Sequence, residues 1–184
     1  AHQGSEDDLM ETVLERLSIA MNDLSVDGSD LSGLRLALEL EPGPIYLLRN
    51  QETLEKLAAK IDSYDCQLVR SYVGFNLDVA HWWLADKITA KWLDEDASEQ
   101  LRSRIYHSHI SGHSHRGHFG DYSLARIPSG QAVDFRGWLR AITRLSTVDH
   151  VSLEYEAAPS QRDVVESVQA LNRWLRRLEK ETST

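Results

Sequence analysis

Three carboxylates and one histidine stand at the ends of four short apolar runs in this sequence. If those runs are strands that finish side by side at one rim of a parallel sheet, the four side chains converge there. Three carboxylate oxygens and one imidazole nitrogen are a suitable ligand set for a divalent metal ion. The runs cover residues 36–39, 75–78, 105–109 and 151–154, and their terminal residues, the predicted metal ligands, are Glu39, Asp78, His109 and Glu154.

The segments between these runs have the apolar spacing of helices, as a parallel sheet requires. An initial helix is expected over 6–24, and Asn50, Asp134 and Ser160 are suitable N-caps for three further helices. The strands are expected over 34–40, 72–77, 104–110 and 151–153. We therefore predict one α/β domain over residues 1–184, with a mostly parallel sheet and four strand–helix units after the first helix.

Composition limits the class of protein and its partners. The chain has 184 residues, of which 41% are hydrophobic, and this fits one soluble domain with a substantial core. A formal net charge of -9 would repel both nucleic acid and an anionic membrane surface. The single cysteine, Cys66, cannot form an internal disulfide, and no apolar stretch approaches the roughly 20 residues of a membrane span. We expect a cytoplasmic protein with no nucleic-acid or membrane partner, for which small, sugar-sized ligands are easier partners than polyanions.

At these residues the chain resembles the xylose isomerase-like barrel superfamily, which includes sugar and sugar-phosphate isomerases and epimerases and metal-dependent apurinic-site endonucleases. The likeness covers nearly the whole sequence, and its motifs occur in the family's order. One departure is Gly112, which stands where many relatives carry an aspartate. The motifs are similar to the third-strand His-x-Gly at His2, the fourth-strand glutamate at Glu39, the fifth-strand Asp-x-x-His at Asp78 and His81, the sixth-strand histidine at His109 and the seventh-strand glutamate at Glu154.

The resemblance implies a (β/α)8 TIM barrel, of which this chain covers about the C-terminal half to two-thirds, from the end of strand 3 onward. Four strands cannot close a barrel, so such a part exposes two sheet edges and an apolar flank. We therefore expect that the N-terminal strands are lacking here, and that a second chain or a further segment completes the barrel.

The resemblance also implies an activity, that of a divalent-metal-dependent isomerase or epimerase that acts on a sugar or sugar phosphate through an enediolate. Glu39 and Glu154 would be the acid/base pair as well as metal ligands. The hard ligand set favours manganese as the cofactor, with magnesium, cobalt and zinc as alternatives. The predicted substrate contacts are His2, His81, Arg116 and His118.

Two other functions fit part of the pattern. The first is a metal phosphodiesterase of the apurinic-site endonuclease kind, but the Asp-x-His pair of those enzymes has no counterpart beyond Arg116-Gly117-His118, and the acidic composition offers no track for DNA. The second is a non-catalytic barrel that binds a metabolite or a partner subunit. For Asp78, a simpler role is also open, namely the N-cap of the helix that follows it.

Overall fold

Four parallel strands form the centre of the fold, in the spatial order β1-β2-β3-β4. The structure is a computed structural model that describes residues 5–26, 28, 30–111, 133–155 and 160–182. Each strand lies within two residues of its predicted position, and the parallel α/β arrangement predicted from the sequence is confirmed. The strands are β1 (Leu36–Glu39), β2 (Val73–Asp78), β3 (Ile105–Ser111) and β4 (Val151–Glu154).

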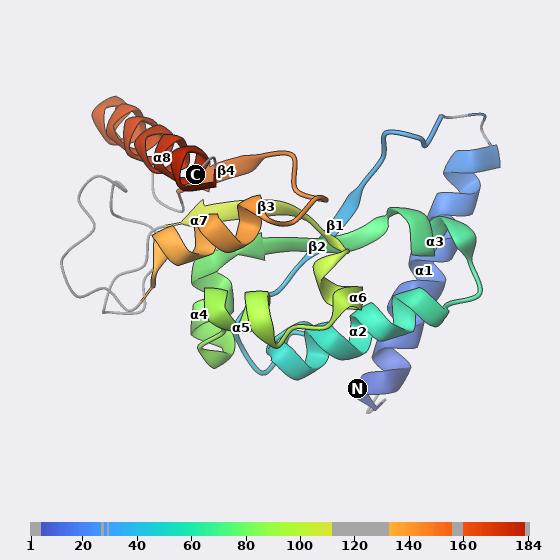
Figure 1. Ribbon diagram of the computed structural model, residues 1–184. Helices are drawn as coiled ribbons and strands as arrows, with labels where there is room; N and C mark the ends of the chain where they lie inside the picture. The colour runs from blue at the N-terminus through green and yellow to red at the C-terminus, as the bar shows by residue number, and fades with distance from the viewer. Residues whose placement is uncertain (1–4, 27, 29, 112–132, 156–159, 183–184) are drawn as a thin grey trace.

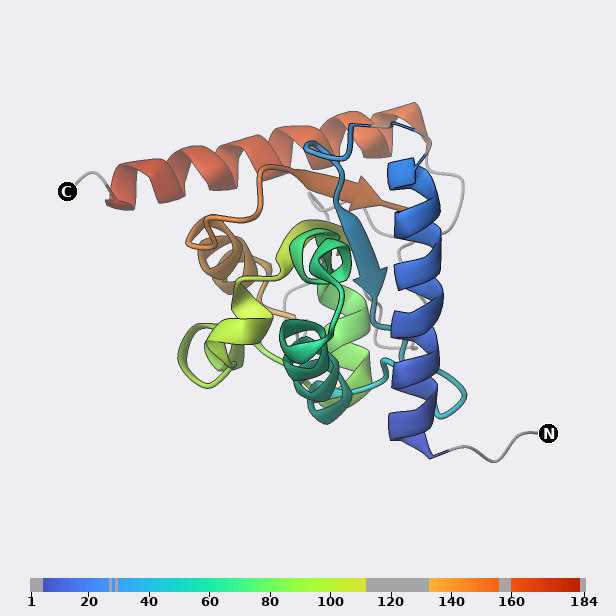
Figure 2. The same cartoon turned by 90° about the vertical axis from the view of Figure 1, so that its right-hand side faces the viewer.

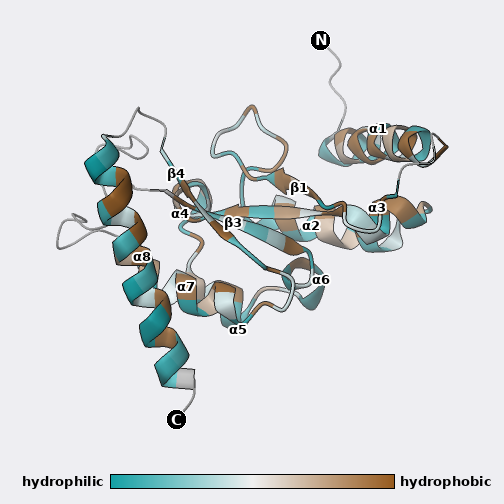
Figure 3. Ribbon diagram, turned by 90° about the horizontal axis from the view of Figure 1, so that it is seen from above, coloured by the Kyte–Doolittle hydropathy of each residue, from teal (hydrophilic) through white to brown (hydrophobic). Residues whose placement is uncertain are grey.

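Helices precede and connect the strands. Four of them, α2, α4, α5 and α6, lie together on one side of the sheet, while α1 and α8 lie at its two opposite ends (Figures 1 and 3). None of the described helices is long and apolar enough to cross a membrane. The helices are α1 (Glu6–Val26), α2 (Gln51–Ser63), α3 (Gln67–Tyr72), α4 (Val79–Asp86), α5 (Ala90–Glu95), α6 (Glu99–Arg102), α7 (Phe135–Thr143) and α8 (Gln161–Thr182).

The three predicted N-caps are confirmed. Asn50 forms a capping box with Thr53 at the start of α2, and the side chain of Asp134 accepts a hydrogen bond from the Gly137 backbone at the start of α7. Ser160 and Asp163 exchange hydrogen bonds at the start of α8. Such caps satisfy backbone N–H groups that have no partner inside the helix, so these boundaries are encoded locally.

Strand β2 is buried along its whole length, and its two faces differ in chemistry. Val73, Phe75 and Leu77 belong to the hydrophobic core. Asn76 and Asp78 alternate with them and therefore project from the opposite face. The core also contains Trp82, whose ring meets those of Trp92 and Trp138 edge-on at 6.2 and 6.0 Å. The sheet thus has one apolar face against helices and one polar face.

An irregularity sets the register of β2 against β3. Phe75 pairs with Ile105, but Asn76 pairs with His107, so Tyr106 is an extra residue in β3. The ring of Tyr106 and the carbonyl of Arg104 come so close to Gly74 that a Cβ there would meet them at 2.5 and 2.2 Å. The bulge therefore requires glycine at position 74.

The outer strands β1 and β4 form the edges of the described sheet, and α1 runs beside β1 as α8 runs beside β4 (Figure 2). Apolar side chains on these two helices are exposed, among them Leu9 and Leu24 of α1 and Val165 and Val168 of α8. Open edges with an apolar flank agree with the expectation for part of a barrel. Completion of the barrel by another segment or chain stays a prediction.

Candidate metal centre

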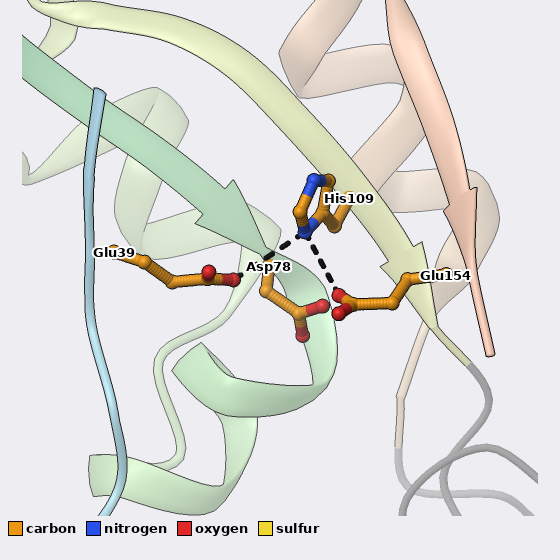
Figure 4. Close-up of side chains that lie close together, drawn as sticks. All are labelled: Glu39, Asp78, His109 and Glu154. Carbon is orange, nitrogen blue, oxygen red and sulfur yellow. Dashed lines mark ion pairs between the residues drawn. The ribbon is translucent and has the colours of Figure 1, made fainter. Parts of the chain in front are cut away.

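Each of the four predicted metal ligands lies at or near the C-terminal end of a different strand. Glu39, Asp78 and Glu154 are the last residues of β1, β2 and β4, and His109 lies in β3 directly beside Asp78. Because the strands are parallel, these ends meet at one rim of the sheet. The four side chains point toward one another there, as Figure 4 shows.

The ligand atoms of these four residues all lie within 4.8 Å of one another. Nδ1 of His109 is 2.8 Å from Oε2 of Glu154 and 3.4 Å from Oε1 of Glu39, as the dashed lines in Figure 4 indicate. The carboxyl group of Asp78 lies between those of the two glutamates. One imidazole nitrogen and three carboxylates thus surround a common point.

The electrostatics of this cluster show what such crowding does to each group. In its protonated form the ring of His109 hydrogen-bonds Glu39, and this contact raises the pKa of His109 and lowers the pKa of Glu39. Burial raises the pKa of Glu154, and the neighbouring carboxyl of Asp78 raises it further. One histidine cannot neutralise three carboxylates, whereas a divalent cation would, so the donor set fits such an ion.

The cluster is buried at one end and open at the other. Asp78 is fully buried, while the side chains of His109, Glu39 and Glu154 are 24%, 30% and 37% exposed. A small ligand could therefore reach the two glutamates from the solvent side while Asp78 forms the floor.

Asp78 also caps the helix that follows it. Its Oδ1 accepts hydrogen bonds from the backbone N–H groups of Ala80 and His81, each at 2.8 Å, at the start of α4. The two roles considered for Asp78 are therefore compatible, because a carboxylate has a second oxygen. The cap fixes the orientation of the carboxyl group toward the rim.

His81 is brought beside Glu39 by the first turn of α4. It is buried, and its Nδ1 lies 3.1 Å from the carbonyl oxygen of Leu40 and 3.7 Å from Oε1 of Glu39. Since a carbonyl only accepts, Nδ1 carries the proton. The predicted contact of His81 with substrate stays a prediction. The other predicted substrate contacts, His2, Arg116 and His118, lie outside the described residues.

Sequence reasoning placed Asn76 on the face of β2 that carries Asp78 but did not predict its partners. Its Nδ2 lies 3.1 Å from Oε1 of Glu39 and 3.0 Å from Nδ1 of His109, so one amide bridges two of the predicted ligands. The available signal was its position two residues before Asp78, on the same face of β2. That alternation indicates the face but not the partner.

Comparison with known families agrees with this architecture. A family model described as "Xylose isomerase-like TIM barrel" matches residues 2–178. The chain belongs to this family. The resemblance seen in the sequence and the predicted barrel class are therefore confirmed.

Among the solved structures, one that resembles this chain is the IolI protein, determined at 1.8 Å with a bound zinc atom. The TM-score is 0.63 at 16% sequence identity, and the match covers 96% of this chain and 60% of the IolI chain. At this identity the likeness concerns the fold alone, and the chain spans about three-fifths of the length of IolI. A search of curated proteins gives no match.

Proposed function

We propose that this xylose isomerase-like protein is a divalent-metal-dependent isomerase or epimerase of a sugar or sugar phosphate. Glu39, Asp78, His109 and Glu154 would hold the ion, and Glu39 and Glu154 would also exchange protons with the substrate. The single observation that carries the proposal is the convergence of these four side chains, from four strand ends, to within 4.8 Å. Membership of a superfamily in which sugar isomerases and epimerases are common gives independent support.

The two glutamates enter the cluster from opposite edges of the sheet, Glu39 from β1 and Glu154 from β4, with Asp78 between them. Glu39, Asp78, His109 and Glu154 would hold a divalent ion, which would supply positive charge to stabilise the negative charge that develops when a carbon-bound proton leaves an open-chain sugar. One glutamate would take that proton. The other would return a proton to the adjacent carbon in an isomerase, or to the opposite face of the same carbon in an epimerase.

The remaining groups would position the substrate. His81 lies next to Glu39 and would contact a substrate oxygen or orient the glutamate, and His2, Arg116 and His118 stay predicted contacts. The ligand set of one nitrogen and three carboxylates suits manganese, magnesium or cobalt, and zinc is the ion that IolI holds. We rank manganese first.

The decisive experiment combines metal analysis with a screen of aldoses, ketoses and their phosphates in the presence of Mn²⁺. We expect one ion per chain and turnover of at least one substrate. Several ions per chain would favour the phosphodiesterase, and no bound ion would favour a non-catalytic binding protein.

Substitution then tests the acid/base pair. The Glu154→Gln variant should lose turnover while substrate binding stays measurable, because an amide cannot exchange the proton. Glu95→Gln is the matched control, since Glu95 is exposed on α5 and pairs only with Lys91 among the described ion pairs. Unchanged turnover in Glu154→Gln would remove Glu154 from the mechanism.

A further inference from the structure

We propose that Asn76 is a positioning residue of the metal centre, whose amide nitrogen holds the Glu39 carboxylate and directs the Nδ1 lone pair of His109 toward the ligand cluster. This role rests on the proposed function, because it concerns metal binding. The position of the ring proton on His109, however, can be measured without metal or substrate. Asn76 is buried on β2, between β1 and β3, where it pairs in register with Glu39 and lies two residues before Asp78 on the polar face of the sheet.

The orientation of the amide follows from its neighbours. Oε1 of Glu39 lies 3.1 Å from the amide group of Asn76, and an ionised carboxylate only accepts hydrogen bonds. The amide must therefore present Nδ2 to Glu39, since the flipped orientation would bring two oxygens together. In this orientation Oδ1 is buried and has no hydrogen-bond partner among the described residues. The Oδ1 of Asn76 therefore stays unsatisfied, while both hydrogens of Nδ2 point toward Glu39 and His109.

The second hydrogen of Nδ2 favours one tautomer of His109. Nδ2 lies 3.0 Å from Nδ1 of His109, and two N–H groups at that distance would repel each other. The contact is favourable when Nδ1 carries the lone pair and the ring proton is on Nε2. Nδ1 is also the nitrogen that faces the carboxylates, so this tautomer is the one that binds a metal ion.

A competing interaction makes the role of Asn76 necessary. Oε2 of Glu154 lies 2.8 Å from the same Nδ1, and an ionised carboxylate there favours a proton on Nδ1. That proton would have to leave before a metal ion could bind. Without the amide of Asn76, we expect Nδ1 to donate to Glu154 and the metal affinity to fall.

The first measurement is a long-range ¹H–¹⁵N NMR spectrum of the side chain of His109 in the metal-free wild-type protein, at a pH where the ring is neutral. We expect an unprotonated Nδ1 and a protonated Nε2. A proton on Nδ1 would overturn the proposal, and this result requires no variant and no bound metal.

The second measurement compares Asn76→Leu with Ser108→Ala. Ser108 is a buried control on β3 whose Oγ donates to the Leu77 carbonyl, so its loss costs a buried hydrogen bond without touching the cluster. In Asn76→Leu we expect Nδ1 of His109 to become protonated and the affinity for Mn²⁺ and Zn²⁺, measured by calorimetry, to fall about 10- to 100-fold. In Ser108→Ala both properties should stay as in the wild type.

Equal metal affinities and equal ring spectra in Asn76→Leu and Ser108→Ala would show that Asn76 has only a structural role. If the wild type binds neither ion, the proposed function fails, but the spectrum of His109 still decides the role of Asn76.

Discussion

Asp78 and His109 are direct partners in the parallel register of β2 and β3, and the extra residue Tyr106 puts them there. In a regular ladder that continued from the Phe75–Ile105 pair, Asp78 would stand beside Ser108, whose side chain points to the other face of the sheet. The bulge thus brings a carboxylate and an imidazole to the same face at the same height. The candidate metal centre depends on this register.

Gly74 should be required for that register. In Gly74→Ala the new Cβ would meet the backbone of Arg104 and the ring of Tyr106, so we expect the free energy of unfolding to fall by about 1–3 kcal/mol or more. The metal affinity of Gly74→Ala should fall as well, because the bulge positions His109. Urea unfolding and calorimetry measure the two effects. Gly33→Ala is the control, since its Cβ meets nothing within 4 Å, and equal stability of the two variants would contradict the requirement.

The two functions of Asp78 can be separated by substitution. Asp78→Asn keeps an oxygen that can cap α4 but removes the charge, so metal affinity should fall at least about tenfold while the metal-free protein stays folded. Asp78→Ala loses the cap as well, and its free energy of unfolding should lie about 1–2 kcal/mol below that of Asp78→Asn. Thermal unfolding in chelator compares the two variants. A stable Asp78→Ala variant would show that the cap is dispensable.

Metal affinity should weaken in acid. The hydrogen bond with Glu39 raises the pKa of His109 in the metal-free protein, so a proton competes with the ion from a higher pH than for an isolated imidazole. Below that raised pKa, each unit of pH should cost up to about tenfold in affinity, and above it the affinity should level off with respect to this group. Calorimetry between about pH 5 and 8 in buffers of different ionisation heat measures both the affinity and the released protons.

His150→Gln should keep the same pH dependence, because His150 is exposed and its ring contact among the described residues is with His107, at 6.4 Å between centroids, rather than with a predicted ligand. An affinity that does not change with pH in the wild type would contradict the assignment of His109 as a ligand.

Metal should stabilise the folded chain. At a free concentration of 100 times Kd, a ligand that binds only the native state adds about 2.7 kcal/mol, which for a chain of this size corresponds to a rise in Tm of about 5–10 °C. The rise should be absent in the Asp78→Asn variant at the same metal concentration. Differential scanning calorimetry with Mn²⁺ and with chelator makes the comparison, and identical transitions in the wild type would argue against a site in this cluster.

The sequence alone determined the local features of the protein. Asn50, Asp134 and Ser160 begin helices because a side chain can satisfy a nearby backbone N–H whatever the rest of the chain does. The acidic or histidine end of each apolar run indicated the rim of a parallel sheet, and all four predicted ligands meet there. The helix α3 was not predicted, because its six residues are too few to show a helical period.

Only the tertiary structure decided the bulge at Tyr106, the close approach at Gly74 and the bridging position of Asn76. Alternation along one strand shows which residues share a face, but it carries no information on which residue of the next strand stands opposite. That register is fixed by contacts between segments that are distant in the sequence. The identity of the candidate ligands is therefore local, whereas their convergence is a property of the assembled sheet.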